Sequence, residues 1–200
     1  MHITNRVGPP VEGNDFYGRQ RELKIANRLL NAGNSLLLAA PRRIGKSSFA
    51  KKLLTQKKEE DWKCVYIDLE EVQTEEDFLK LLISSLDSGH LWSNVASTAT
   101  KTLKAALNRI KDIKVGPVSV DITTADTDVD LYQVLSRAID HGSKSLIVID
   151  ELTLFLNCVE RQENGENKMK FILNWLRSLR QVSGTEVRWL FSGSVGLNNF

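Results

Sequence analysis

The 200-residue sequence lacks the features that membrane-spanning and secreted proteins require. It has no apolar run of about 18 residues, the length from which a helix can cross a bilayer. Its first residues contain no apolar segment typical of a secretory signal. Only two cysteines occur, Cys64 and Cys158, which are too few for a disulfide framework. We therefore expect a cytoplasmic protein with no membrane partner and with both cysteines reduced in the core.

The sequence also lacks a strong excess of charge of either sign. Lys and Arg total 27 and Asp and Glu total 25, which gives a formal net charge of +2. No overall positive field therefore favours nucleic acid as a partner, although a local basic patch is not excluded. The composition, 42% hydrophobic and 26% charged, is that of a globular protein. The length suits about one domain with a sizeable core.

The most informative stretch covers residues 35–48. Residues 35–39 form a predicted strand, Pro41 interrupts it, and a helical pattern begins at residues 45–47. The spacing fits the phosphate-loop pattern G-x-x-x-x-G-K-[ST], except that Ala40 stands in place of the first glycine. Alanine is compatible with that position if its φ angle is negative. The residues predicted to bind the nucleotide here are Ala40, Pro41, Arg42, Arg43, Ile44, Gly45, Lys46, Ser47 and Ser48.

Several residues of this loop have distinct predicted roles. Gly45 lets the backbone approach a phosphate closely, and the N-terminus of the following helix favours an anion. Lys46 is predicted to reach the β- and γ-phosphates as a catalytic residue, and the Ser47 hydroxyl is predicted to ligate Mg²⁺. Arg42 and Arg43 either contact phosphates or face solvent or a partner domain.

A second group of candidate residues follows a strand far downstream. Residues 146–149 are consecutive aliphatic residues, which indicates a strand buried on both faces, and Asp150 and Glu151 come at its carboxyl end. Asp150 is predicted to hold Mg²⁺ opposite Ser47, and Glu151 to polarise the attacking water as a general base. Ser192 ends the next strand. Its hydroxyl contacts the γ-phosphate or the water, or it is an ordinary strand-terminal serine.

The remaining pattern predicts strands alternating with helices, which is typical of an α/β fold. Strands are expected at residues 35–39, 64–69, 146–150 and 187–191, and residues 57–61 are expected to be a solvated connector of mixed charge. Residues 1–14 are predicted to be an extended arm, before a core at 15–200. An insert at about 87–130 combines an amphipathic helix with a short β-hairpin. It is interpreted either as a partner surface or as an elaborated crossover.

Together these residues resemble the AAA+/STAND group of P-loop ATPases, in particular predicted ATPases of archaea and bacteria. Residues 16–23, 41–47 and 147–151 carry the resemblance, and residues 191–194 resemble that family's turn after a strand. The resemblance covers nearly the whole chain, least specifically at the insert. It implies a three-layer fold of the ASCE type, with a parallel sheet in the order 5-1-4-3-2.

The resemblance also implies contacts with the nucleotide base. The segment before the phosphate loop lies near adenine in such families, so Phe16, Tyr17, Gly18 and Arg19 are predicted to be close to the base. For Phe16 and Tyr17, packing against the first helix is an equal alternative. ATP rather than GTP is inferred from the resemblance alone. The fifth strand, the helical lid and the C-terminal effector region of relatives are not found, so we expect either an N-terminal piece of a longer protein or a truncated product.

The resulting functional prediction is a Mg²⁺-dependent, ATP-binding and ATP-hydrolysing module that acts as a switch for a C-terminal effector or partner protein. Weak turnover is expected from this chain because lid contacts are missing, and oligomer formation is left open. One alternative is a nucleotide-sensing scaffold that does not hydrolyse ATP. Another is a nucleic-acid-associated ATPase resembling origin-recognition proteins, with a cationic helix at 101–114 whose DNA binding would depend on salt.

Overall fold

The computed structural model describes residues 18–92 and 131–194 of the chain. The predicted arm at 1–14, Phe16 and Tyr17, and most of the predicted insert lie outside the described residues. Within the described part, no helix combines the length and apolar character needed to cross a membrane.

The centre of the fold is a parallel sheet. Its strands are β1 (Leu36–Ala40), β2 (Lys63–Asp68), β3 (Ser145–Asp150) and β4 (Val187–Ser194). They are arranged in the order β1-β4-β3-β2, and every neighbouring pair is parallel. This confirms the order 1-4-3-2 within the predicted sheet, and the described residues contain no fifth strand beside β1. The predicted strand positions are correct to within a few residues.

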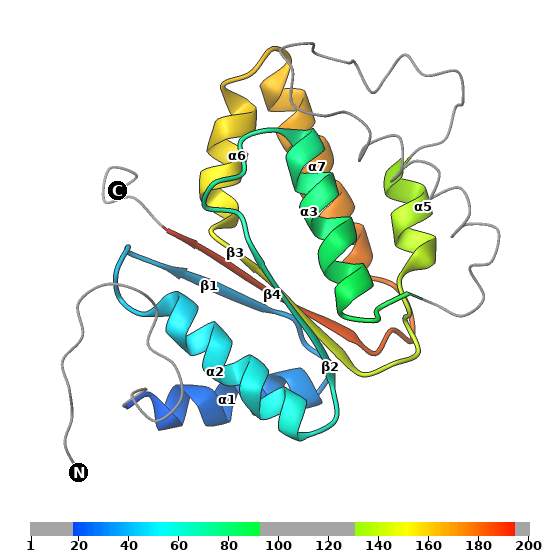
Figure 1. The fold of residues 1–200 in the computed structure, drawn as a ribbon. Coiled ribbons are helices and arrows are strands. Elements are labelled where there is room, and N and C mark those ends of the chain that lie inside the picture. The colour runs from blue at the N-terminus through cyan, green and yellow to red at the C-terminus, as the bar shows by residue number, and fades with distance from the viewer. Residues whose placement is uncertain (1–17, 93–130, 195–200) are drawn as a thin grey trace.

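Helices cover both faces of the sheet, which confirms the predicted three-layer α/β architecture (Figure 1). The helices α1 (Gln20–Asn31) and α2 (Lys46–Glu59) lie on one face. The other face carries α3 (Glu75–Ser88), α5 (Leu131–Ala138), α6 (Leu152–Glu160) and α7 (Gly165–Arg180). Such coverage is expected because parallel strands need crossover connections, and helices supply them.

Two apolar cores, one on each face, explain the uninterrupted aliphatic run of β3. Leu146 and Val148 pack toward α1 and α2, whereas Ile147 and Ile149 pack toward the helices on the opposite face. All four side chains are fully buried. Since side chains alternate along a strand, only a strand covered on both sides needs apolar residues at every position.

Both cysteines are free thiols, as predicted, but they are half-buried rather than in the core. Burial raises the pKa of the Cys64 thiol to about 11. Thr74 caps the N-terminus of α3, since its hydroxyl accepts a hydrogen bond from the backbone N–H of Asp77 at 3.1 Å. Helix α7 begins at Gly165. This glycine packs against the end of α6, where a Cβ atom would lie 2.2 Å from the Val159 carbonyl oxygen.

The prediction of a solvated connector at residues 57–61 is wrong. Helix α2 continues to Glu59, and the Lys57 side chain is fully buried. Its ammonium group donates hydrogen bonds to Asn31 Oδ1 at 2.7 Å and Glu60 Oε2 at 2.8 Å, and it lies 4.7 Å from the centre of the Trp62 ring. The lysine therefore joins the C-terminal ends of α1 and α2, and sequence alone does not distinguish it from its exposed neighbours.

We predict that Lys57→Ala lowers the free energy of unfolding by about 2–3 kcal/mol, because it removes charge-assisted hydrogen bonds and a buried aliphatic stem. Lys58→Ala is the matched control. Lys58 is exposed on the same helix, and its substitution should change the free energy by less than about 0.5 kcal/mol. Denaturant unfolding measures both values. Equal effects of the two substitutions would contradict the role assigned to Lys57.

Candidate functional site

The loop between β1 and α2 has the backbone conformation that the phosphate-loop pattern predicts. Ala40 is the last residue of β1, pairs with Ser194, and is not among the described residues with positive φ. Its replacement of glycine therefore introduces no strain. Arg43 and Gly45 both adopt left-handed conformations, with φ angles of 63° and 82°. At Gly45 no atom lies within 4 Å of an added Cβ, so the φ angle, rather than lack of space, favours glycine.

Lys46 is a buried cation whose hydrogens all have acceptors. Its side chain is only 5% exposed. The ammonium group donates to the carbonyl oxygens of Ala40 and Pro41, each at 3.1 Å, and to Ser194 Oγ at 3.0 Å. A lysine ammonium has three hydrogens, so these acceptors satisfy it. The interactions connect the first turn of α2 to the ends of both β1 and β4.

The hydroxyl of Ser194 also connects Lys46 with Glu151. The Ser194 hydroxyl donates to both carboxylate oxygens of Glu151, at 3.0 and 3.1 Å, and the Lys46 ammonium lies 3.9 Å from Glu151 Oε1. Glu151 has a left-handed φ of 52° at the residue before α6. Such a conformation is uncommon for a residue other than glycine and often marks a functional site.

Asp150 belongs to a second polar group next to the first. It is 1% exposed, and its Oδ1 accepts hydrogen bonds from Ser192 Oγ and from the backbone N–H of Glu151. Its Oδ2 accepts a hydrogen bond from the phenol of Tyr66. Burial, and then the hydrogen bond and charge of Asp150, raise the pKa of the Tyr66 phenol well above its ordinary value. Tyr66 therefore stays protonated and donates.

A close approach between β4 and α6 fixes the position of Ser194. The backbone N–H of Ser194 donates to Thr153 Oγ1 at 3.0 Å, and the Thr153 hydroxyl donates to the Ser194 carbonyl at 3.3 Å. This approach requires glycine at position 193, where a Cβ atom would lie 2.5 Å from Thr153 Cγ2. The sequence Ser192-Gly193-Ser194 thus places two hydroxyls on one face of the strand, with a gap for the helix on the other.

The segment before the phosphate loop also contacts it. Gly18 and Arg19 have φ angles of 82° and 55°, and the guanidinium of Arg19 donates to the carbonyl oxygen of Ile44. The two arginines within the phosphate loop, Arg42 and Arg43, are exposed. This contact places Arg19 beside the loop, and the closeness of the segment to a nucleotide base stays a prediction.

The sequence-predicted residues therefore separate into two neighbouring groups. Lys46 and Glu151 meet at Ser194, whereas Ser192 is buried against Asp150 and makes no described contact with Lys46. Ser48 is buried in the first turn of α2.

Sequence reasoning missed Ser194, Thr153 and Tyr66. For Ser194 a signal existed, because it shares the strand face of Ser192 two residues earlier. For Tyr66 there was none, since its contact depends on the pairing of β2 with β3.

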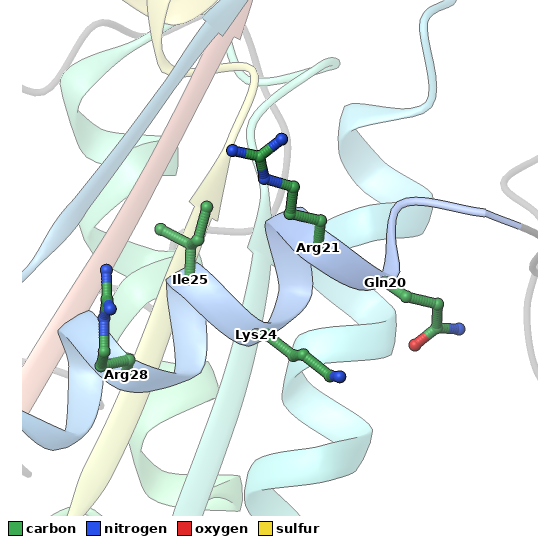
Figure 2. A pocket seen from close by; sticks show the side chains of 5 residues that line it. All are labelled: Gln20, Arg21, Lys24, Ile25 and Arg28. Carbon is green, nitrogen blue, oxygen red and sulfur yellow. The ribbon is translucent and has the colours of Figure 1, made fainter.

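A hollow on the outer side of α1 is separate from these groups. Its volume is about 460 Å³, and none of the residues predicted to bind nucleotide lines it. Figure 2 shows its side chains along one helix. They are mostly cationic, with a single apolar residue: Gln20, Arg21, Lys24, Ile25 and Arg28.

Three solved structures are similar to this chain, and the first of them shows the same fold. The Walker-type ATPase of Pyrococcus abyssi has 16% sequence identity and a TM-score of 0.55, and the match covers 94% of this chain and 48% of that one. The Aeropyrum pernix ORC2 protein, solved as ADPNP and ADP complexes, has 14% identity and a TM-score of 0.47, with 95% and 43% covered. A DNA replication initiation factor has 11% identity and a TM-score of 0.41, with 93% and 41% covered. The chain thus spans about half the length of these proteins or less.

A comparison with curated protein sequences gave no match. The family model described as "AAA domain" matches residues 30–199, which include the phosphate loop, Asp150, Glu151 and both serines of β4. Since that match spans most of the chain, and the fold and loop geometry agree with it, the protein belongs to the AAA domain family of P-loop ATPases.

Proposed function

We propose that the chain binds ATP with Mg²⁺ at this site, hydrolyses it, and uses the nucleotide state to switch a partner or effector domain. The observation that carries the proposal is the meeting of Lys46, Ser194 and Glu151 at the carboxyl ends of β1, β4 and β3. In open parallel sheets, ligands bind outside these strand ends. The STAND grouping, an adenine base and a cytoplasmic location are part of the same proposal.

The phosphate loop supplies the contacts to the polyphosphate. The left-handed conformations at Arg43 and Gly45 are typical of loops whose backbone N–H groups surround an anion, and the N-terminus of α2 adds its positive dipole. Lys46 already has three acceptors, so it must exchange at least one of them to bind a phosphate oxygen. The exposed Arg42 and Arg43 are available for further contacts from the loop.

The oxygen donors near the phosphate loop fit a magnesium ion. Ser47 and Asp150 both contact the phenol of Tyr66, so a hydroxyl and a carboxylate lie within the reach of one side chain. Mg²⁺ prefers such oxygen ligands and binds few protein groups in addition to phosphates. When bound, the ion supplies neutralisation of the charge that develops on the phosphate oxygens.

Glu151 is the proposed general base. Its carboxylate is held by the Ser194 hydroxyl and lies near Lys46, at the edge of the site rather than in the core. A carboxylate held in this way can accept the proton of a water molecule that attacks the γ-phosphate. Ser194, which contacts both Glu151 and Lys46, aligns the base with the phosphate-binding cation. Ser192, as a partner of the buried Asp150, acts on the proposed metal ligand.

Two alternatives follow from the same residues. A nucleotide-sensing scaffold would use the loop and Lys46 but not the base. The nucleic-acid-associated alternative rested on a cationic helix at 101–114, which lies outside the described residues, and it stays a prediction. Hydrolysis is favoured over sensing alone because Glu151 is kept in an uncommon backbone conformation beside Lys46.

The first test of the proposed function concerns ATP binding. Lys46→Ala should weaken ATP binding at least about 10-fold, because it removes charge-assisted hydrogen bonds to phosphate. Titration with fluorescent ATP and GTP analogues in Mg²⁺ measures the affinities, and the exposed Lys58→Ala serves as the control of equal charge change. Absence of ATP binding by the unmodified chain would contradict the proposed function.

A second prediction separates hydrolysis from sensing. Glu151→Gln should leave ATP affinity within about twofold but slow hydrolysis by about 100-fold or more, because the amide cannot accept the proton of water. Single-turnover assays at high protein concentration detect even weak hydrolysis. Glu160→Gln is the matched control, because Glu160 is exposed at the C-terminal end of α6, the helix that follows Glu151. Equal turnover of both variants would instead support the nucleotide-sensing scaffold.

A third prediction distinguishes Ser194 from an ordinary strand-terminal serine. Ser194→Ala should slow hydrolysis on the order of 10- to 100-fold through misplacement of Glu151. Ser194→Thr retains the hydroxyl and should recover most of the rate. Circular dichroism verifies that both variants fold. If alanine and threonine have the same effect on turnover, the hydroxyl has no role in aligning the base.

A further inference from the structure

Tyr66 occupies an unusual place beside the proposed magnesium ligands. It lies on β2 and pairs with Val148 of β3, two residues before Asp150. Its ring packs on the α2 side of the sheet, with the ammonium of Lys51 5.4 Å from the ring centre. Lys51 is four residues after Ser47 on α2, which places both on the same side of that helix. The half-buried tyrosine thus fills the space between α2 and the end of β3.

The phenol of Tyr66 lies next to two polar side chains, those of Asp150 and Ser47. Its hydrogen is donated to Asp150 Oδ2, and the Ser47 side chain lies beside the same phenol. A phenol has one hydrogen to donate and can accept another. Within the described residues, Ser47 and Asp150 have no direct hydrogen bond to each other, and both lie beside the phenol of Tyr66.

We infer that Tyr66 is a positioning residue for the proposed magnesium site, because its phenol donates a hydrogen bond to Asp150 Oδ2 and so orients that carboxylate. The inference rests on the proposed function and adds a residue from a strand that carries no phosphate-loop or acidic motif.

The carboxylate of Asp150 is fixed in a complementary way. Ser192 and the backbone N–H of Glu151 hold Oδ1, while Tyr66 holds Oδ2. Removal of the phenol leaves one edge of the buried carboxylate without its donor. Residues that orient metal ligands in this way typically change metal affinity about 10-fold or more when they are replaced.

The test compares Tyr66→Phe with the unmodified chain. Mn²⁺ serves as a spectroscopic probe for Mg²⁺, and its affinity for the chain with ATP bound is measured from the electron paramagnetic resonance signal of free Mn²⁺. The affinity of fluorescent ATP is measured separately in EDTA. Tyr66→Phe should weaken Mn²⁺ binding about 10-fold and leave metal-free ATP affinity within about twofold.

Tyr132→Phe is the matched control. Tyr132 also donates its phenol hydrogen to a carboxylate, Glu75 Oε1 at 2.6 Å, but on the opposite face of the sheet. Its replacement should leave Mn²⁺ affinity unchanged. Thermal unfolding of both variants verifies that each is folded at the temperature of the assay.

The outcomes separate the inference from the function on which it rests. If the unmodified chain binds neither ATP nor Mn²⁺, the proposed function fails and the role of Tyr66 fails with it. If the unmodified chain binds both and Tyr66→Phe binds Mn²⁺ equally well, only the inference is overturned. It is also overturned if Tyr66→Phe weakens metal-free ATP binding as much as Mn²⁺ binding, because the tyrosine would then act on the phosphate loop as a whole.

Discussion

The buried ammonium of Lys46 is the constraint on which the rest of the site depends. A charge with a 5% exposed side chain is costly unless it has hydrogen-bond partners, and here those partners come from the loop after β1 and from the end of β4. The position of Lys46 therefore requires β1 and β4 to be neighbours in register, as the pairing of Ala40 with Ser194 shows. The glycine at position 193 and the hydroxyl of Thr153 then fix the serine from the other side of the strand.

The two polar groups of the site are joined by adjacent residues at the end of β3. Asp150, the last residue of the strand, belongs to the group with Tyr66 and Ser192, whereas Glu151 belongs to the group with Lys46 and Ser194. Consecutive side chains can serve separate groups because the backbone turns sharply at Glu151, where φ is 52°. A change of backbone conformation there would alter both groups. This is consistent with the placement of strain at positions where function requires it.

Much of this arrangement could be predicted from sequence because it is encoded locally. The spacing of the phosphate loop, the aliphatic run of β3 and the two acids that follow it each occupy one short segment, and the family resemblance that they carry implied the parallel sheet. Ser194, Tyr66 and Lys57 could not be assigned in the same way. Their contacts cross between elements distant in the sequence, to Lys46, Asp150 and Asn31 respectively. Lys57 in particular stands among exposed charged residues, and its burial depends on Asn31 of α1 as well as on Glu60 and Trp62.

The shared use of Ser194 suggests how the proposed nucleotide state is transmitted within the described part of the chain. A ligand shifts a conformational equilibrium only through contacts that differ between the two states. Lys46 can bind phosphate only by giving up an acceptor, and one of its acceptors is the hydroxyl that also holds Glu151. If that hydrogen bond is the one exchanged, the surroundings of Glu151 at the start of α6 change. Because Thr153 of α6 is hydrogen-bonded to the end of β4, the proposed change would reach the contact between that helix and the sheet. Under the proposed function, the same few hydrogen bonds would serve binding, alignment of the base and the proposed switching of a partner.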